Sequence, residues 1–132
     1  MRIIIAGSRT FNDYEYLKES CDIILDLHFD GKPQEFEIVS GHARGADMLG
    51  ERYATERGAK LTLFPADWST YGKKAGHIRN EAMAKYAKED PNSDSMLIAF
   101  WDGTSNGTRN MIGSAFKRGF KHVNIMTDWT TK

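Results

Sequence analysis

Three short segments rich in glycine, serine and threonine carry residue types suited to binding an anion. They read Gly7-Ser8-Arg9-Thr10, Ser40-Gly41-His42-Ala43-Arg44-Gly45-Ala46-Asp47 and Asp102-Gly103-Thr104-Ser105-Asn106-Gly107-Thr108. Where such residues precede a helix, the backbone can approach a ligand closely and its N–H groups point outward. One such segment is weak evidence, because many turns need a glycine, but three together predict a phosphate-binding site.

An arginine accompanies each of these segments, and a fourth arginine follows a later loop. They are Arg9, Arg44, Arg109 and Arg79. The planar guanidinium group suits paired hydrogen bonds to phosphate or carboxylate. We expect Arg9, Arg44 and Arg79 to face the ligand, whereas for Arg109 an outward orientation is an equal alternative.

Several well-known site motifs are missing from the sequence. The first segment is not G-x-G-x-x-G and no G-K-[ST] occurs, which argues against a nicotinamide-dependent dehydrogenase and a P-loop NTPase. No H-E-x-x-H or C-x-x-C occurs either, so we expect neither a metal site nor a cofactor.

The overall composition narrows the possible partners. The 132 residues include 18 basic and 18 acidic side chains, and this zero net charge argues against a general nucleic-acid binder and a polybasic membrane binder. The single cysteine, Cys21, excludes an intrachain disulfide and favours a reducing, cytoplasmic compartment. No apolar run approaches the roughly 18 residues of a membrane span.

Apolar runs that alternate with amphipathic segments must position these residues. We expect strands at 3–6, 36–39, 61–64, 96–100 and 122–126, helices at 13–28, 46–57, 77–88 and 108–118, and a loop at 66–75. This order predicts an α/β, three-layer Rossmann-like fold with a five-stranded parallel sheet. We expect one domain over residues 1–132, in which 126–132 form a possible flexible tail. Ligands of such folds bind beyond the carboxyl ends of the strands, which is where the three segments fall.

Five motifs in order resemble the YspA/YpsA-related branch of the SLOG superfamily, which also contains the Lonely Guy (LOG) enzymes and the DprA/Smf proteins. They are Gly7-Ser8-Arg9, the segment from Ser40 to Asp47, Phe64-Pro65-Ala66-Asp67-Trp68, the segment from Tyr71 to Met83, and the segment from Trp101 to Thr108. The resemblance extends from Arg2 to about Met126. It implies a nucleotide or nucleotide-derived ligand and, from the relatives, a homo-oligomer.

The resemblance also assigns roles to individual residues. Arg79, followed by Asn80 and Met83, is similar to an arginine that LOG enzymes carry ahead of the fourth strand. Gly107-Thr108 matches part of their P-G-G-x-G-T-x-x-E motif, but Met111 stands where those enzymes have glutamate. Hydrolysis of a glycosidic bond needs a carboxylate, which methionine does not supply.

A different carboxylate must therefore act if the chain is a hydrolase. Asp47, Asp67 and Asp102 are the candidates, and Asp67 comes first because its neighbour Trp68 could raise its pKa or stack on a base. Asp67 could equally be a capping or turn residue, Asp47 a first-turn helix residue, and Asp102 a turn former or a ribose ligand. The candidate catalytic pair is Arg79 with Asp67.

The sequence thus predicts a protein that senses, sequesters or processes a nucleotide-derived ligand. The alternative is a LOG-like phosphoribohydrolase with a replaced acid, and a DprA-like nucleic-acid module is less favoured. The expected ligand-binding residues are Gly7, Ser8, Arg9, Gly41, His42, Arg44, Gly45, Asp47, Trp68, Arg79, Asn80, Asp102, Gly103, Thr104, Ser105, Asn106, Gly107 and Thr108.

Overall fold

The computed structural model describes residues 1–30, 35–89 and 94–130. Within these ranges, five parallel strands form one sheet in the order β3-β2-β1-β4-β5. The strands are β1 (Arg2–Gly7), β2 (Glu37–Ser40), β3 (Lys60–Leu63), β4 (Ser95–Phe100) and β5 (His122–Met126). The predicted α/β Rossmann-like fold is therefore confirmed.

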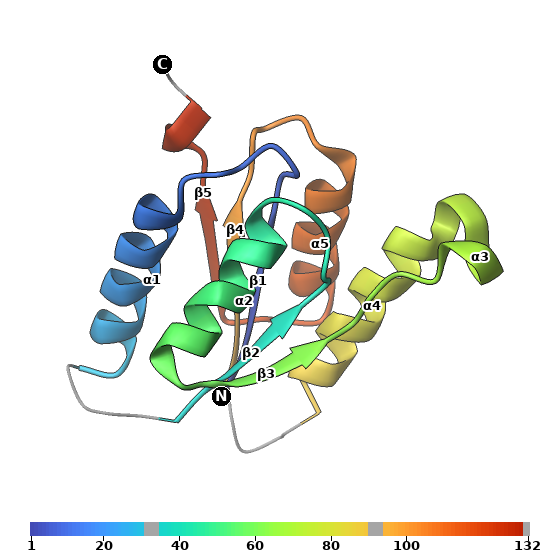
Figure 1. Cartoon of the computed structure of the whole chain (residues 1–132). Coiled ribbons are helices and arrows are strands. Elements are labelled where there is room, and N and C mark those ends of the chain that lie inside the picture. The colour runs from blue at the N-terminus through green and yellow to red at the C-terminus, as the bar shows by residue number, and fades with distance from the viewer. Residues whose placement is uncertain (31–34, 90–93, 131–132) are drawn as a thin grey trace.

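Helices cover both faces of the sheet (Figure 1). Helices α1 (Tyr14–His28) and α2 (Ala46–Arg57) pack on one face, and α4 (Ala75–Ala87) and α5 (Asn106–Lys117) pack on the other. Side chains alternate along β1, so that Ile3 and Ile5 join the first core cluster, whereas Ile4 and Ala6 join the second. This two-sided burial explains why β1 is continuously apolar in sequence.

Most element boundaries lie within two residues of those expected from sequence. Helix α2 and strand β5 match in full, and Gly58 ends α2 in the left-handed conformation, with φ of 67°. Cys21 is fully buried and contributes to the core. Gly50 lets α2 pack closely on the sheet, because a Cβ there would lie 2.7 Å from Cγ2 of Ile5.

The segment 66–75, expected to be a loop, is instead largely helical. It contains α3 (Trp68–Tyr71) and a 3-10 helix, η1 (Gly72–Lys74), which lead into α4. Asp67 caps α3, since its side chain accepts a hydrogen bond from the Thr70 N–H at 3.1 Å. Figure 1 shows α3 extending away from the sheet beside the start of α4.

The C-terminal segment, expected as a possible flexible tail, contacts the core through Trp129. A short 3-10 helix, η2 (Asp128–Thr130), follows β5, and the Trp129 ring lies edge-on to Phe11 with centroids 4.9 Å apart. The indole N–H donates to the Met126 carbonyl at 2.9 Å. Residues 131–132 lie outside the described part of the chain.

No helix in the described ranges is both long enough and apolar enough to cross a membrane.

Candidate functional site

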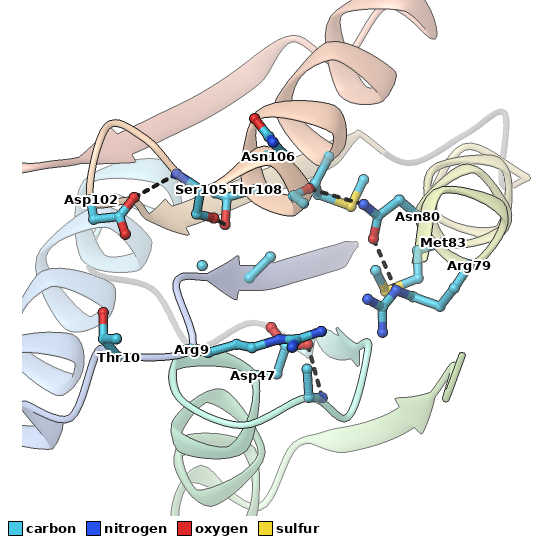
Figure 2. Close-up of a pocket in the computed structure, with 15 residues that line it drawn as sticks. Arg9, Thr10, Asp47, Arg79, Asn80, Met83, Asp102, Ser105, Asn106 and Thr108 are labelled. Carbon is cyan, nitrogen blue, oxygen red and sulfur yellow. Dashed lines mark hydrogen bonds between the residues drawn. The ribbon is translucent and has the colours of Figure 1, made fainter. Parts of the chain in front are cut away.

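A cavity of about 370 Å³ opens at the carboxyl end of the sheet, between the loops that follow β1, β2 and β4 and the start of α4. Figure 2 shows its side chains converging from these different elements. The lining residues are Ala6, Gly7, Arg9, Thr10, Ala43, Asp47, Arg79, Asn80, Met83, Asp102, Ser105, Asn106, Gly107, Thr108 and Met111. Its volume lies within the range of small-molecule pockets.

Ser8 joins the three loops into one rigid rim. Its N–H donates to the Phe100 carbonyl at 2.9 Å, its hydroxyl accepts from the Asp102 N–H at 3.0 Å, and its carbonyl accepts from the Ala46 N–H at 3.3 Å. A Cβ at Gly45 would lie 2.3 Å from the Ser8 carbonyl oxygen, so only glycine allows this approach. Ser8 is buried and positions the site rather than lining it.

The N-terminus of α5 supplies backbone N–H groups to the cavity. Asp102 shapes the loop before it, since one carboxylate oxygen accepts from the N–H groups of Thr104 at 2.9 Å and Ser105 at 2.8 Å. These hydrogen bonds hold the pKa of Asp102 below its usual value. Ser105, the N-cap residue, forms no side-chain capping bond, so the first-turn N–H groups remain available to an anion.

Asn80 ties α4 to this helix end. Its amide donates to the Gly107 carbonyl at 3.1 Å and to Oδ1 of Asn110 at 3.0 Å, while its own Oδ1 accepts from Nε of Arg79 at 2.9 Å. Asn80 therefore fixes both the α5 N-terminus and one edge of the Arg79 guanidinium.

Arg79 crosses from α4 to the loop after β2. Its Nη1 donates to the Gly41 carbonyl at 2.5 Å. Burial lowers the pKa of Arg79. The nearby charge of Asp47 opposes this shift, and the charge of Arg9 adds to it. Arg79 nevertheless remains a cation, as arginine does in proteins. Arg9 is exposed, and both arginines line the cavity.

Asp47 is the buried carboxylate of the cavity, with only 5% of its surface exposed. Its Oδ2 accepts a hydrogen bond from the Ala43 N–H at 3.1 Å. Burial raises the pKa of Asp47 to about 6, although this hydrogen bond and the Arg79 charge oppose the shift. A Cβ at Gly41 would lie 2.5 Å from Nη1 of Arg79 and 2.9 Å from Oδ2 of Asp47, so glycine leaves room for both charges.

His42, beside the cavity, contacts Glu51, a residue that the sequence did not single out. Its Nδ1 lies 2.9 Å from Oε2 of Glu51, which also accepts from the Ser40 hydroxyl at 2.8 Å. His42 adopts a left-handed conformation, with φ of 59°, that few residues other than glycine favour. His42 and Glu51 are nine positions apart in sequence, and they come into contact because α2 folds back along β2.

The structure brings ten of the predicted ligand-binding residues to the cavity wall and leaves the others outside it. Those on the wall are Gly7, Arg9, Asp47, Arg79, Asn80, Asp102, Ser105, Asn106, Gly107 and Thr108. Those outside are Ser8, Gly41, His42, Arg44, Gly45, Trp68, Gly103 and Thr104. The wall residues that were not predicted to bind the ligand are Ala6, Thr10, Ala43, Met83 and Met111. Thr10 and Ala43 lie within the glycine-rich segments, which could have pointed to them, whereas Ala6 is an apolar strand residue.

Three residues that the sequence offered as candidates for the site do not line the cavity. Asp67 is exposed, and its hydrogen bonds with Thr70 and Ser69 lower its pKa, the reverse of the expected rise. Trp68 is half exposed on α3, outside the cavity wall. Arg109 lies over the Trp101 ring, 5.5 Å from its centroid, and does not line the cavity.

Met111 and Met83 form an apolar part of the cavity wall, and each is 1% exposed. In the described ranges no three histidine, cysteine, aspartate or glutamate side chains are grouped so as to hold a metal ion.

Comparison with known proteins agrees with this architecture. Residues 1–71 match the model of the YspA, cpYpsA-related SLOG family. The chain belongs to this SLOG family. It is also 34% identical over 129 residues to the Gene 61 protein of Mycobacterium phage D29, an alignment that covers 94% of this chain and 95% of the phage protein. No solved structure matches the chain. Membership of the SLOG family points to the binding or processing of a nucleotide-related ligand.

Proposed function

We propose that this SLOG protein binds a nucleoside monophosphate or a related phosphorylated ligand in the cavity at the carboxyl end of the sheet. The phosphate lies on the N-terminus of α5, between Arg79 and Arg9. The observation that carries the proposal is the uncapped α5 N-terminus on the same cavity wall as two arginines. Backbone N–H groups and guanidinium groups are the usual donors to phosphate in proteins.

Isothermal titration with AMP tests the proposal. We expect Arg79→Ala to weaken AMP binding at least tenfold, because a charged hydrogen bond to the phosphate is lost. Arg44→Ala is the matched control, since Arg44 is exposed in a neighbouring loop and does not line the cavity. The proposal is wrong if wild-type protein shows no heat of binding with AMP or other nucleotides, or if the two variants lose affinity equally.

A LOG-like phosphoribohydrolase is the second candidate function, and the environment of Asp47 favours it. A buried carboxylate with a pKa of about 6 can exchange protons near neutral pH, whereas Met111 cannot. Asp67, exposed and hydrogen-bonded as the cap of α3, is less suited to this role. Chromatography after incubation with nucleoside monophosphates shows whether free base is released. Turnover that survives in Asp47→Asn would contradict a catalytic Asp47, and AMP binding without turnover would leave only the binding function.

We also propose that the chain is a single domain that forms a homo-oligomer. Its proposed ligand is a small molecule rather than a nucleic acid. A DNA mobility shift that weakens with salt would contradict the second point, because phosphate contacts make nucleic-acid binding steeply salt-dependent.

A further inference from the structure

We propose that Asp47 accepts a hydrogen bond from a ribose hydroxyl of the ligand, so that the cavity selects phosphorylated ribose over a ligand without these hydroxyls. This inference rests on the proposed phosphate site and specifies its ligand further.

Two other side-chain oxygens on the cavity wall already accept hydrogen bonds from the protein, and Asp102 is more exposed than Asp47. One oxygen of Asp102 accepts from Thr104 and Ser105, and Oδ1 of Asn80 accepts from Arg79. Among the described residues, the one hydrogen bond found for the Asp47 carboxylate comes from the Ala43 N–H. A buried carboxylate oxygen is costly to leave without donors, so Asp47 retains capacity for a donor from the ligand.

The charges around Asp47 define what kind of donor it takes. A phosphate group would be repelled by the carboxylate, and it has better partners in Arg79, Arg9 and the α5 N-terminus. An ammonium group would meet the positive charges of Arg79 and Arg9, both of which act on Asp47. The complementary partner is therefore an uncharged donor such as a hydroxyl.

The position of Asp47 indicates where on the ligand this hydroxyl lies. Oδ2 of Asp47 and Nη1 of Arg79 both lie within 3 Å of the point where a Gly41 Cβ would stand. Figure 2 shows the two side chains reaching toward the same space from α2 and α4. A donor at Asp47 is thus close to the phosphate subsite, and in a nucleoside 5′-monophosphate the uncharged donors nearest the phosphate are the ribose hydroxyls.

The test compares AMP with 2′,3′-dideoxy-AMP by isothermal titration at pH 8, where Asp47 is ionised. We expect wild-type protein to bind AMP at least tenfold more tightly, as is typical of a hydrogen bond to a charged group. In Asp47→Asn and Asp47→Ala the two nucleotides should bind within about threefold of each other. Sulfate should bind these variants as tightly as wild type or more tightly, which shows that the fold and the anion subsite are intact.

The possible results separate this inference from the proposed function. Equal affinities of wild-type protein for the two nucleotides would overturn the role of Asp47 and leave the phosphate site standing. Discrimination that persists in both variants would also overturn it, because another group would then read the hydroxyls. Inosine monophosphate keeps the ribose but lacks the adenine amino group. If wild-type protein binds it more weakly than AMP and Asp47 variants do not, the donor to Asp47 belongs to the base instead. Absence of binding by every nucleotide would overturn the proposed function as well.

Discussion

At the scale of single residues, the cavity places cations and one buried carboxylate in close proximity. Arg79 is fixed by Gly41 and Asn80, whereas Asp47 is held by one backbone hydrogen bond and kept from water. This arrangement leaves a positive site whose charge depends on the protonation of Asp47.

Anion binding should strengthen as Asp47 takes up a proton. Sulfate keeps its charge between pH 5 and pH 8, so its affinity reports the protein alone. We expect wild-type affinity for sulfate to rise several-fold as pH falls through about 6, because a nearby negative charge is removed. In Asp47→Asn, which retains His42 and the other titratable groups, the rise should disappear. A rise of equal size in the variant would assign the effect to a different residue.

The same group should make the free protein less stable at high pH. The pKa of Asp47 is raised from 3.8 to about 6 in the folded state, so its contribution to folding stability falls as pH rises through this window and stays low above it. Asp47→Asn should therefore increase the free energy of unfolding at pH 8, by on the order of 2 kcal/mol, with little change near pH 4. Urea denaturation at the two pH values measures this difference, and a variant less stable than wild type at pH 8 would contradict the account.

Gly41→Ala should disturb the site more than the fold. The added Cβ would meet the Arg79 guanidinium and the Asp47 carboxylate, and the flexible arginine can move aside. We expect AMP affinity to fall about tenfold, as when one charged hydrogen bond is lost, while thermal unfolding changes little. Unchanged AMP affinity would show that the position of Arg79 against Gly41 does not matter for binding.

At the scale of elements, α5 contains two glycines that the free fold does not require. A Cβ at Gly107 or at Gly113 would meet no atom within 4 Å, and neither residue has a positive φ. Both are exposed, but Gly107 lies in the first turn on the cavity wall, whereas Gly113 lies in the middle of the helix. At Gly107 the absence of a Cβ would let a ligand phosphate approach the backbone closely, and this reason does not apply at Gly113.

This difference gives a matched pair of variants. Gly113→Ala should stabilise the protein by about 0.5–1 kcal/mol and leave AMP binding unchanged, since alanine is the better helix former. Gly107→Ala should not destabilise the fold but should weaken AMP binding. Thermal unfolding and titration of both variants measure the outcome. If Gly107→Ala binds AMP as well as Gly113→Ala does, the phosphate does not contact this turn. Loss of stability or of assembly in Gly113→Ala would instead show that α5 packs against a second chain.

At the scale of the whole molecule, the sequence predicted the sheet and the general place of the site. Alternating apolar and amphipathic segments define the parallel fold, and glycine-rich segments after β1, β2 and β4 fall at one sheet edge for topological reasons. Arg9 and Asp47 belong to these segments, and Arg79 follows the loop after β3, which is why the sequence predicts all three at this end of the sheet. The sequence could not show that Asp47 is buried while Asp67 is exposed, because burial depends on how α2 and α3 pack.

Local capping and long-range contacts account for most of the remaining differences. Asp67 next to Trp68 suggested a shielded carboxylate, but the pair begins a short helix that extends away from the sheet. Ser8 was expected to bind phosphate, yet its N–H, carbonyl and hydroxyl are used to join loops up to 94 positions apart. Polar residues in such loops can either hold the site together or contact the ligand, and only the fold separates these roles.

A crystal structure of the protein with AMP tests the central claim most directly. The account predicts the phosphate within hydrogen-bond distance of the Gly107 and Thr108 N–H groups and of the Arg79 guanidinium, with the ribose directed toward Asp47. AMP bound outside this cavity, for example against the exposed Trp68 on α3, would contradict it.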